Sequence, residues 1–446
     1  MDQIVELSQM LEARECRAQR QHELLERYGL PLVSFTMNIA GPVKNSPSIR
    51  QAFALGRDLL FGQLQRVKAP LIHREEIDEP TGSEGLYVVD LPCALLKEIT
   101  IEIEEHTALG RLFDMDVIDS SGKKLERARA RRCLICGKPA QECARSRTHS
   151  VHELQRKTHE LLSAALNKHD GDSVAAFAVR ALLYEVAVTP KPGLVDREGN
   201  GSHHDMDFYT FLSSASSFFP YFSECFHIGR KTAADPAQFT FSCLRIPGKL
   251  AEGEMLRVTG GVNTHKGAIF TLGIICGALG RLPREAWRSP DDILNQAADM
   301  TRDVERELWG FTEATARTAG QRIFARCGIS GVRGQAAAGF PTVLHCGLPV
   351  LENGLLHGKS RDEAGAAALL AILSCTDDTN MISRGGMETE NEKRRRLAEL
   401  LACDPYPDRE TLQALDREYT AENLSPGGSA DLLALCWLLH FLKEEQ

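Results

Sequence analysis

Strand-forming patterns are concentrated in the first third of this chain of 446 residues and nearly vanish after it, where helical patterns predominate. The first third combines both kinds of pattern, with helical stretches at 2–28 and 48–65 and strand-like runs at 85–90, 99–104 and 112–118. From about residue 152 onward, long helical patterns alternate with connections rich in glycine or proline. We therefore predict a multidomain protein in which a mixed α/β domain precedes a larger all-α domain.

The length and composition agree with a folded protein of more than one domain. A single hydrophobic core stops growing near about 250–300 residues, so this chain is expected to divide. Hydrophobic residues make up 43% and charged residues 25% of the chain, which excludes global disorder and a fibrous repeat. Apolar periodicity is weakest at 144–172, and within this stretch we place the boundary between domains at 1–155 and 156–446.

Charge and hydropathy exclude several classes of partner. With 52 Lys and Arg against 61 Asp and Glu, the formal net charge of -9 disfavours non-specific binding to nucleic acid. The apolar runs at 366–375 and 432–442 are shorter than the roughly 18–20 residues that span a membrane. The N-terminal stretch is acidic and amphipathic rather than an export signal, and the thirteen cysteines mostly stand singly in apolar context. We expect a cytoplasmic protein with reduced thiols.

Two acids stand two residues apart in the strand-like run GRLFDMDV. On a strand, Asp114 and Asp116 project from the same face, about 7 Å apart. Such a pair suits Mg²⁺ held together with substrate phosphates, the arrangement used in phosphoryl or nucleotidyl transfer. The nine Lys and Arg against two Glu at 123–147 could grip further phosphate oxygens. The alternative is an exposed strand edge with solvated acids, which the short pattern alone favours.

Two other features of this domain are ambiguous. Lys44 follows the Gly41-Pro42 turn and could reach a phosphate, although the pattern also fits an ordinary strand and turn. Cys133 and Cys136 open a zinc-knuckle-like C-x-x-C-G, but the spacing to Cys143 and His149 is not that of a standard finger. We therefore favour reduced cysteines in a turn that presents the basic segment, with a structural zinc at Cys133, Cys136 and Cys143 as the alternative.

The helical domain begins its polar segments with TPKPGLVD and HHDMDF. Two prolines bracket Lys191 and fix its backbone, and Asp196 follows shortly after. In the second segment, the pair Asp205 and Asp207 is a candidate for binding a metal ion, and His204 is a candidate base. A helix N-terminus that favours acids for dipole reasons is the competing explanation, and the spacing does not decide between them.

A glycine-rich loop leads into a helix of small residues at 268–280. A loop of this kind exposes unpaired N–H groups at the positive end of the helix dipole, where a phosphate chain can bind. The loop does not match the P-loop consensus. The candidate ligand-binding residues of the loop are Gly260, Gly261, Asn263, His265 and Lys266.

Three further segments repeat the combination of glycines with charged residues. Arg333 stands between glycines and Arg384 precedes a glycine pair, so both are candidates for binding phosphate. Asp377 and Asp378 are candidate metal ligands. A segment at 425–431 opens the last helix, with Ser429 expected as its N-cap. The recurrence of such segments in one helical domain indicates a site for polyphosphate and metal.

Together these motifs resemble two known enzyme families. The segments TPKPGLVD, HHDMDF, GGVNTHKGAIFTLG, GVRG with GFPTV, DDTNMISRGG and SPGGSADLLA resemble the triphosphoribosyl-dephospho-coenzyme A synthase of the citrate lyase system. Residues 31–44, GRLFDMDV and CLICGKPAQECARSR resemble its partner, the apo-citrate lyase phosphoribosyl-dephospho-coenzyme A transferase, or holo-acyl-carrier-protein synthase. The chain thus resembles a fusion of the two. One departure is Gln335, where the family pattern leads us to expect Glu, so a general-base role there is in doubt.

The resemblance implies two successive reactions. In the all-α domain, the ribose 2'-hydroxyl of 3'-dephospho-coenzyme A attacks C1' of ATP, and adenine departs while the triphosphate is kept. This displacement needs carboxylate charge, a clamp on the triphosphate and a base. The implied phosphate-binding residues are Lys191, Lys266 and Arg333. The implied ligands of Mg²⁺ or neighbours of the cationic carbon are Asp205, Asp207, Asp377 and Asp378, and the base is Asp196 or His204.

In the α/β domain, which we expect to be nucleotidyltransferase-like, the resemblance implies transfer of the phosphoribosyl-dephospho-coenzyme A unit to a serine of the citrate lyase acyl carrier protein, the gamma subunit. Pyrophosphate is released. Asp114 and Asp116 would hold Mg²⁺, and Arg111 and Lys44 would bind phosphate. The basic run at 123–147 fits an acidic carrier protein.

Two alternatives remain open at this point. A helical, metal-dependent ADP-ribosyl or nucleotide hydrolase with an accessory binding domain would also contain scattered Asp pairs and glycine turns. Such an enzyme would use water as acceptor and would not need dephospho-coenzyme A. A zinc-containing RNA-binding element at 123–149 would instead show RNA affinity that falls steeply with salt, without turnover.

Overall fold

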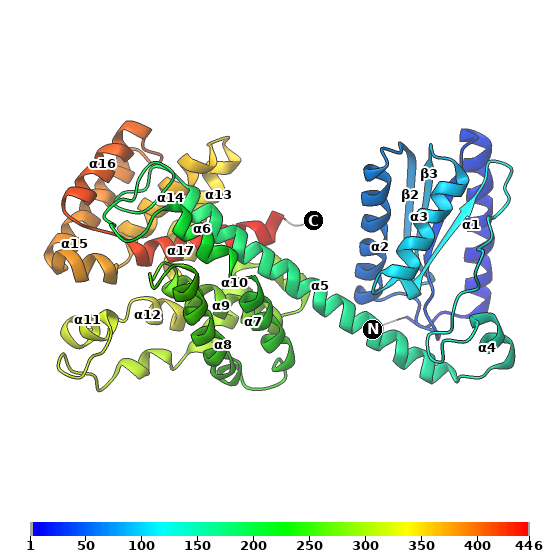
Figure 1. The fold of residues 1–446 in the computed structure, drawn as a ribbon, viewed down its shortest axis with the longest axis horizontal. Coiled ribbons are helices and arrows are strands. Elements are labelled where there is room, and N and C mark those ends of the chain that lie inside the picture. Colours follow the sequence, from blue (N-terminus) through cyan, green and yellow to red (C-terminus); the bar gives the residue numbers. More distant parts are fainter. Residues whose placement is uncertain (1–2, 445–446) are drawn as a thin grey trace. The chain divides into compact units, whose positions relative to one another are not determined.

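The computed structural model describes residues 3–444, and the chain divides into two compact units, residues 1–169 and 170–446 (Figure 1). Helix α5 (Val151–Ala187) contributes to both. Its first half places Leu162 and Leu166 in the core of the first unit, and its second half places Val174 and Leu182 in the core of the second. Each unit therefore has its own hydrophobic core.

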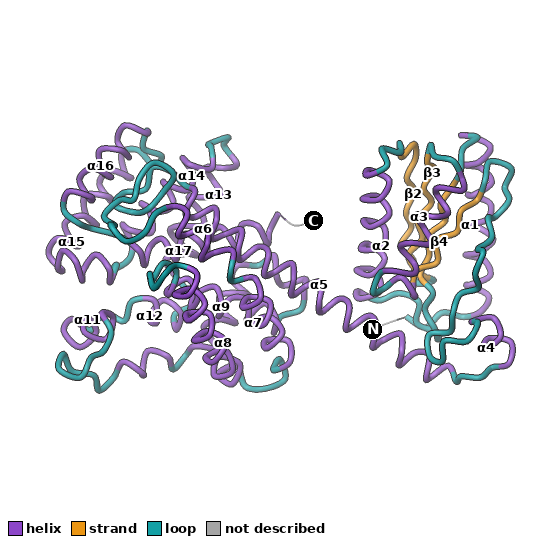
Figure 2. The backbone as a smooth tube through the Cα atoms, viewed as in Figure 1, coloured by secondary structure: helices purple, strands orange, loops and turns teal. Residues whose placement is uncertain are grey.

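The first unit contains a four-stranded antiparallel sheet with strand order β2-β3-β1-β4. Figure 2 shows the strands in this unit alone, and this holds for all strands among residues 3–444. The strands are β1 (Leu32–Met37), β2 (Leu71–Glu79), β3 (Gly82–Val89) and β4 (Phe113–Ile118). The helices are α1 (Leu7–Tyr28), α2 (Pro47–Arg66), α3 (Cys93–His106) and α4 (Ala140–Ser146).

The two faces of the sheet pack against different helices because side chains alternate along each strand. Val33 and Phe35 of β1 share a core with buried residues of α2 and α3. Leu32 points to the opposite face, where it joins Leu24 and Leu25 of α1. Since β1 pairs with β4 in antiparallel register, Asp116 lies opposite Ser34 on the α1 side of the sheet.

The prediction of a strand at 99–104 is wrong, because these residues belong to α3. The alternating sequence Ile-Thr-Ile-Glu-Ile-Glu resembles a half-buried strand. However, the residues that α3 buries include Leu96, Ile99 and Ile103, which are spaced by three and four and so share one helix face. The predicted helix at 2–28 is α1, which begins at Leu7, and residue 2 lies outside the described residues.

All regular secondary structure in the described residues of the second unit is helical. Its longer helices are α6 (Phe208–Ser216), α7 (Phe219–Lys231), α8 (Ala237–Val258), α9 (Lys266–Arg281), α10 (Pro290–Thr301), α11 (Ala319–Cys327), α13 (Leu348–Leu356), α14 (Arg361–Cys375), α15 (Thr379–Cys403), α16 (Arg409–Ala421) and α17 (Gly427–Glu444). A short helix, α12 (Val332–Ala337), follows α11. The apolar runs noted in the sequence lie in α14 and α17, which are buried on nearly all sides.

Glycines allow α7 and α9 to pack closely at the centre of this unit. A Cβ on Gly229 would stand 2.0 Å from the carbonyl oxygen of Gly277, and a Cβ on Gly280 would stand 2.1 Å from that of Phe226. Any larger residue at either position would force the helices apart. This contact fixes α9, whose N-terminus borders the site described below.

Two local predictions for this unit differ from the structure. The aromatic stretch 208–222 forms two helices, because α6 ends at Ser216 and α7 begins at Phe219. Ser429 is not the N-cap of the last helix, because α17 already begins at Gly427. The hydroxyl of Ser429 instead donates to Asp378 at 2.9 Å, so its partner is a side chain of another segment.

No helix among the described residues is both long and apolar enough to cross a membrane.

Candidate active sites

Six polar segments of the helical unit converge on one cleft of about 440 Å³, which is within the usual range for small-molecule sites. The end of α5 with the loop that follows it contributes, as do the loops before α6, α9 and α15, the helix α12 and the first turn of α17. The predicted site residues that line this cleft are Lys191, Asp205, Asn263, His265, Lys266, Asp377, Asp378 and Arg384. Groups far apart in the sequence thus face a common space.

The other predicted residues of this unit do not line the cleft. The carboxylate of Asp196 accepts hydrogen bonds from the backbone N–H groups of Lys191, Glu198 and Gly199, at 3.0, 2.8 and 3.1 Å. Asp207 is the N-cap of α6 and accepts from the N–H of Thr210 at 2.8 Å. The remaining residues outside the cleft lining are His204, Gly260, Gly261 and Arg333. Asp207 has the capping geometry that the helix-dipole explanation describes.

Lys191 is nearly inaccessible and forms an ion pair with Glu185 at the cleft. The ammonium Nζ donates to Oε1 of Glu185 at 2.5 Å and to the backbone carbonyl of the same residue at 2.8 Å. Burial raises the pKa of Glu185, while the ammonium of Lys191 acts in the opposite direction. An ammonium group has three donors, so these two contacts leave one N–H of Lys191 for a ligand.

Asp378 connects two helix N-termini. Its Oδ1 accepts from the N–H groups of Asn380 and Met381 at the start of α15, at 2.9 and 3.2 Å. Its Oδ2 accepts from the N–H and the hydroxyl of Ser429 in α17, at 2.8 and 2.9 Å. Burial raises the pKa of Asp378, and these hydrogen bonds oppose the rise. A carboxylate offers about four lone-pair sites, so a metal would have to displace one of these donors.

Two other charged groups of the cleft are held by neighbours. Asp377 pairs with Arg394 of α15 at 2.5 Å. Arg384 donates to the backbone carbonyl of Ser202 at 3.1 Å and to the side chain of Asn423 at 3.2 Å, which fixes its guanidinium beside His203. Both charges are therefore positioned before any ligand binds.

His265 lines the cleft and has one ring nitrogen without a hydrogen-bond partner among the described residues. The imidazole Nδ1 lies 2.8 Å from the hydroxyl of Ser214, whereas the buried Nε2 has no hydrogen-bond partner among the described residues. Burial lowers the pKa of His265 to about 3, and the charge of Lys191 adds to this effect. The imidazole is therefore neutral at pH 7 and can form a hydrogen bond with a bound ligand.

Sequence reasoning missed three ionisable groups that line the cleft, Glu185, His203 and Asp431. Each lies inside or beside a motif that was noted for another residue. A Cβ on Gly267 would stand 1.9 Å from Oδ2 of Asp431, so only glycine lets this carboxylate approach the start of α9. Burial, together with the charges of Glu185 and Asp378, raises the pKa of Asp431 well above its ordinary value. The glycine at position 267 was the one sequence signal that another group approaches the backbone at the start of α9.

Gln335, the departure from the family pattern, also lines this cleft. Its amide nitrogen donates to the hydroxyl groups of Thr342 and Thr376, at 2.8 and 3.1 Å. An amide has no carboxylate charge and is not a general base at this position. The observed contacts give Gln335 a role in connecting α12 to the segment before Asp377.

In the first unit, Asp114 and Asp116 lie on the same face of β4, as the spacing predicts. Asp114 pairs with Arg131 at 3.2 Å, and Asp116 pairs with Lys124 at 2.5 Å. Burial raises the pKa of Asp114, and the neighbouring Asp116 raises it further, against the effect of Arg131. Two carboxylates with this mutual repulsion are suited to a shared divalent cation.

The two basic residues predicted beside this pair have different surroundings. Lys44 donates to the backbone carbonyl of Ile39 at 2.6 Å, and burial lowers the pKa of its ammonium group. Burial and the charge of Arg131 lower the pKa of Arg111. Sequence reasoning did not single out Arg131 or Lys124, which are the bases that contact the acids. They belong to the basic run, which the structure folds back over β4.

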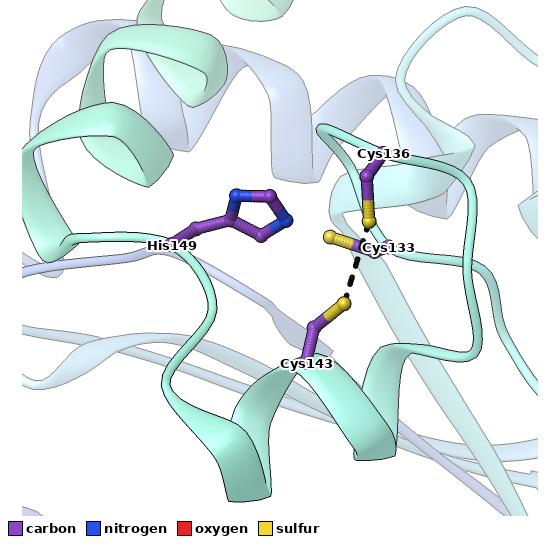
Figure 3. A group of neighbouring side chains, drawn as sticks. All are labelled: Cys133, Cys136, Cys143 and His149. Atoms are coloured by element: carbon purple, nitrogen blue, oxygen red, sulfur yellow. Dashed lines mark hydrogen bonds between the residues drawn. The ribbon is translucent and has the colours of Figure 1, made fainter.

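The cysteine cluster of this unit includes a histidine (Figure 3). One ligand atom from each of Cys133, Cys136, Cys143 and His149 can be chosen so that all four lie within 4.8 Å of one another. In Figure 3 the three thiols point toward one another and the imidazole faces them. The sulfur atoms of Cys136 and Cys143 are 3.4 Å apart.

Comparisons with known proteins identify both units. Residues 171–446 match the family model described as ATP:dephospho-CoA triphosphoribosyl transferase (CitG), and residues 5–165 match the model described as apo-citrate lyase phosphoribosyl-dephospho-CoA transferase (CitX). These matches confirm the resemblance inferred from the motifs, with the apo-citrate lyase phosphoribosyl-dephospho-CoA transferase domain at the N-terminus.

Curated relatives contain the same combination. Protein CitXG of Haemophilus influenzae is 34% identical over 97% of this chain and 95% of its own length. Protein CitXG of Leuconostoc mesenteroides subsp. cremoris is 33% identical over 96% of this chain and 95% of its own length. The 2-(5''-triphosphoribosyl)-3'-dephosphocoenzyme-A synthase of Pectobacterium atrosepticum is 41% identical over 59% of this chain and 87% of its own length. The chain therefore belongs to the family of bifunctional transferases that fuse CitX and CitG domains in one polypeptide.

Proposed function

We propose that the cleft of the helical unit binds ATP and 3'-dephospho-coenzyme A and that the acidic pair of the first unit carries out the transfer to the acyl carrier protein. The observation that carries this proposal is the convergence of Lys191, Lys266 and Asp377 on one cleft within the unit that matches the ATP:dephospho-CoA triphosphoribosyl transferase family. The products of the first reaction are free adenine and 2'-(5''-triphosphoribosyl)-3'-dephospho-coenzyme A.

We assign phosphate binding to the start of α9 and the positively charged side chains near it. Lys266 is the first residue of α9, at the positive end of the helix dipole, which favours an anion. Asn263, Lys191 and Arg384 face the same space, and the pre-positioned guanidinium of Arg384 can donate hydrogen bonds to a phosphate with little loss of entropy. We assign these groups to the triphosphate of ATP.

A divalent cation fits the acids that line this cleft. Asp205 and Asp377 line the cleft with carboxylates, and one or two such groups together with substrate phosphates are the usual ligands of Mg²⁺. When bound, Mg²⁺ supplies positive charge that offsets the charge of the triphosphate. We assign Asp378 a positioning role instead, because its four hydrogen bonds join α15 to α17.

We assign the general base to Asp431. A base near the 2'-hydroxyl must line the cleft, and neither Asp196 nor His204 does so. Asp431 lines it and has a raised pKa, which makes its carboxylate a stronger proton acceptor than an ordinary aspartate. The neutral imidazole of His265 can orient the substrate through its free Nε2.

The second reaction is assigned to the face of β4. Asp114 and Asp116 supply carboxylates for Mg²⁺, and Arg131 and Lys124 lie close enough to bind the pyrophosphate that leaves. The serine hydroxyl of the carrier protein attacks the first phosphorus atom of the triphosphate, and the bond to the second phosphate breaks. Basic residues at 123–147 favour encounter with an acidic carrier protein.

We propose that both reactions take place in the cytoplasm. All thirteen cysteines are free, as is usual in a reducing compartment. ATP and dephospho-coenzyme A are small-molecule substrates that need no membrane contact.

The test is an incubation of the full chain with ATP, Mg²⁺ and 3'-dephospho-coenzyme A, followed by chromatography for free adenine. Apo carrier protein is then added, and its mass is measured. The proposal requires adenine release that depends on dephospho-coenzyme A, and a mass gain equal to one phosphoribosyl-dephospho-coenzyme A unit. Release of adenine or ribose phosphates without dephospho-coenzyme A would instead identify a nucleotide hydrolase.

A further inference from the structure

The segment between β4 and α5 has almost no hydrophobic core of its own. Apart from α4, a helix of seven residues, it consists of turns and irregular chain. Most of its residues are partly or fully exposed, while Cys143 is only 8% exposed. Segments with so little apolar burial usually need a covalent or metal cross-link to keep one conformation.

The geometry of the four side chains is that of a metal site. Around tetrahedral zinc with Zn–S bonds of about 2.3 Å, neighbouring ligand atoms lie about 3.5–3.8 Å apart. The four ligand atoms of Cys133, Cys136, Cys143 and His149 lie within 4.8 Å of one another, and two of the sulfur atoms are 3.4 Å apart (Figure 3). Small side-chain movements would bring all four to bonding distance of one ion.

The backbone around Cys133 has the form of a zinc knuckle. The N–H of Ile135 donates to Sγ of Cys133 at 3.5 Å, which stabilises negative charge on that sulfur. Gly137 follows with a φ of 71°, a left-handed conformation that glycine adopts without strain. Its N–H donates to the carbonyl of Cys133 at 3.3 Å and closes the turn. The C-x-x-C-G sequence is therefore folded so that both thiols face inward.

His149 supplies independent support for a ligand. Its Nε2 is buried, and no described group forms a hydrogen bond with it. A buried nitrogen without a partner is costly, and coordination to a metal would satisfy it. A disulfide would join two of the three thiols, but it would leave the third thiol and this imidazole unexplained.

We propose that Cys133, Cys136, Cys143 and His149 bind one structural Zn²⁺ that holds the basic segment against the acidic face of β4. Three thiolates and one imidazole form a closed tetrahedral set with no position for water, which excludes a catalytic zinc. The sequence alone favoured free thiols, because its spacing does not match a standard finger. The fold adds that His149, which lies just before α5, has a ligand atom within 4.8 Å of those of the three cysteines.

The position of the cluster indicates what the zinc does. Arg131 precedes Cys133 by two residues, and it contacts Asp114 and the backbone carbonyls of Gly110 and Phe113. Arg127 pairs with the buried Glu104, which in turn accepts from the N–H of Met115 on β4 at 2.7 Å. The zinc would thus fix the chain that delivers these arginines to the transferase site. This consequence rests on the proposed function of the first unit, whereas zinc binding itself does not.

The experiment measures metal in the full chain, expressed in zinc-supplemented medium and purified under reducing conditions. Elemental analysis by mass spectrometry is expected to find about one zinc per chain. The zinc content of the double variant C136S/C143S is expected to be at least about ten-fold lower than that of the wild-type chain. The matched control Cys16→Ser changes an exposed cysteine of the same unit and should keep the zinc.

A second variant separates metal binding from simple misfolding. His149→Cys converts the set to four thiolates, which also bind structural zinc, so zinc content should be retained. After exchange with Co²⁺, this variant should show a stronger thiolate-to-cobalt charge-transfer absorption than the wild-type chain. Loss of metal in His149→Cys would contradict the ligand assignment.

Three results would overturn the proposal: a wild-type chain without zinc, zinc retained in C136S/C143S, or iron in place of zinc. With zinc bound, its removal should lower transfer to the carrier protein and leave adenine release unchanged. Zinc bound as expected but no transfer activity in any chain would count against the proposed function of the first unit and not against the metal site.

Discussion

The ammonium of Lys191 lies 2.5 Å from the carboxylate of Glu185, and both side chains are almost completely buried beside the cleft of the helical unit. An ion pair in this position has lost most of its water, so removing one partner leaves an uncompensated buried charge and destabilises the fold. Lys191 and Glu185 are six residues apart, across the end of α5, and the pair fixes the loop that leads toward Asp196.

Removing one member of this pair should destabilise the helical unit strongly. Lys191→Met leaves the Glu185 carboxylate buried without its partner, which is expected to cost about 3–5 kcal/mol. All three tryptophans, Trp287, Trp309 and Trp437, lie in this unit, so tryptophan fluorescence during urea unfolding reports on it. Lys443→Met, which breaks the more exposed pair with Glu352, should cost about 1 kcal/mol or less. Equal losses in the two variants would show that the buried pair has no special weight.

Asp431 should be essential for adenine release. Asp431→Asn keeps the shape of the side chain but removes the proton acceptor, so the rate should fall by about 10²–10⁴-fold. Asp299→Asn, on the exposed side of α10, is the control and should have little effect. Chromatographic measurement of adenine gives the rate. Wild-type adenine release by Asp431→Asn would remove this residue from the mechanism.

His265 should make the helical unit less stable in mild acid. Its folded pKa of about 3 lies below the value of about 6.5 expected in the unfolded chain. Between these values the unfolded state binds a proton that the folded state does not, so this contribution to stability falls as the pH falls from about 6.5 toward 3.

The variant His265→Gln separates the pH-dependent contribution of His265 to stability from the contributions of the acidic groups. The cleft also holds carboxyl groups with raised pKa values, such as Asp378 and Asp431, which bind protons in the folded state and act in the opposite direction. The free energy of unfolding should be measured at several pH values for both chains. The difference between wild type and variant should change by up to about 1.4 kcal/mol per pH unit. A difference independent of pH would show that His265 titrates normally.

The sequence predicted the architecture where local pattern and tertiary packing agree. The strand at 112–118 and the helices at 48–65 and 268–280 are present because their apolar spacing matches the face that they bury. At 99–104 the two signals disagree. There the β-branched residues resemble a strand, but a helix buries Ile99 and Ile103 together.

The candidate sites show a similar limit. Motifs rich in glycine and charge identified the segments that meet in the cleft, but not which side chain of each segment faces inward. His203 lines the cleft while the adjacent His204 does not, and Asp205 lines it while Asp207 caps a helix. Which of two neighbouring side chains faces the cleft depends on the path of the backbone in each loop. The close approach of the Asp431 carboxylate to Gly267 likewise depends on tertiary structure, because the two residues lie in different helices, α17 and α9.

Asp114 and Asp116 should be required for the second reaction alone. Asp114→Asn and Asp116→Asn should each reduce transfer to the carrier protein by at least about 10²-fold when the triphosphoribosyl intermediate is supplied. Asp58→Asn, at an exposed position of α2, serves as the control. Intact-protein mass spectrometry of the carrier protein gives the extent of transfer. Full transfer by either variant would place the metal site elsewhere.

The central claim is that two independent sites on one chain act in sequence, and complementation tests it most directly. Asp114→Asn chains given ATP, Mg²⁺ and 3'-dephospho-coenzyme A should release adenine without modifying the carrier protein. Asp377→Asn chains should do neither, yet they should modify the carrier protein when the intermediate is added. A mixture of the two variants should restore the full mass gain from ATP and dephospho-coenzyme A. The account would be contradicted if folded Asp114→Asn chains failed to release adenine, or if folded Asp377→Asn chains failed to modify the carrier protein from the added intermediate.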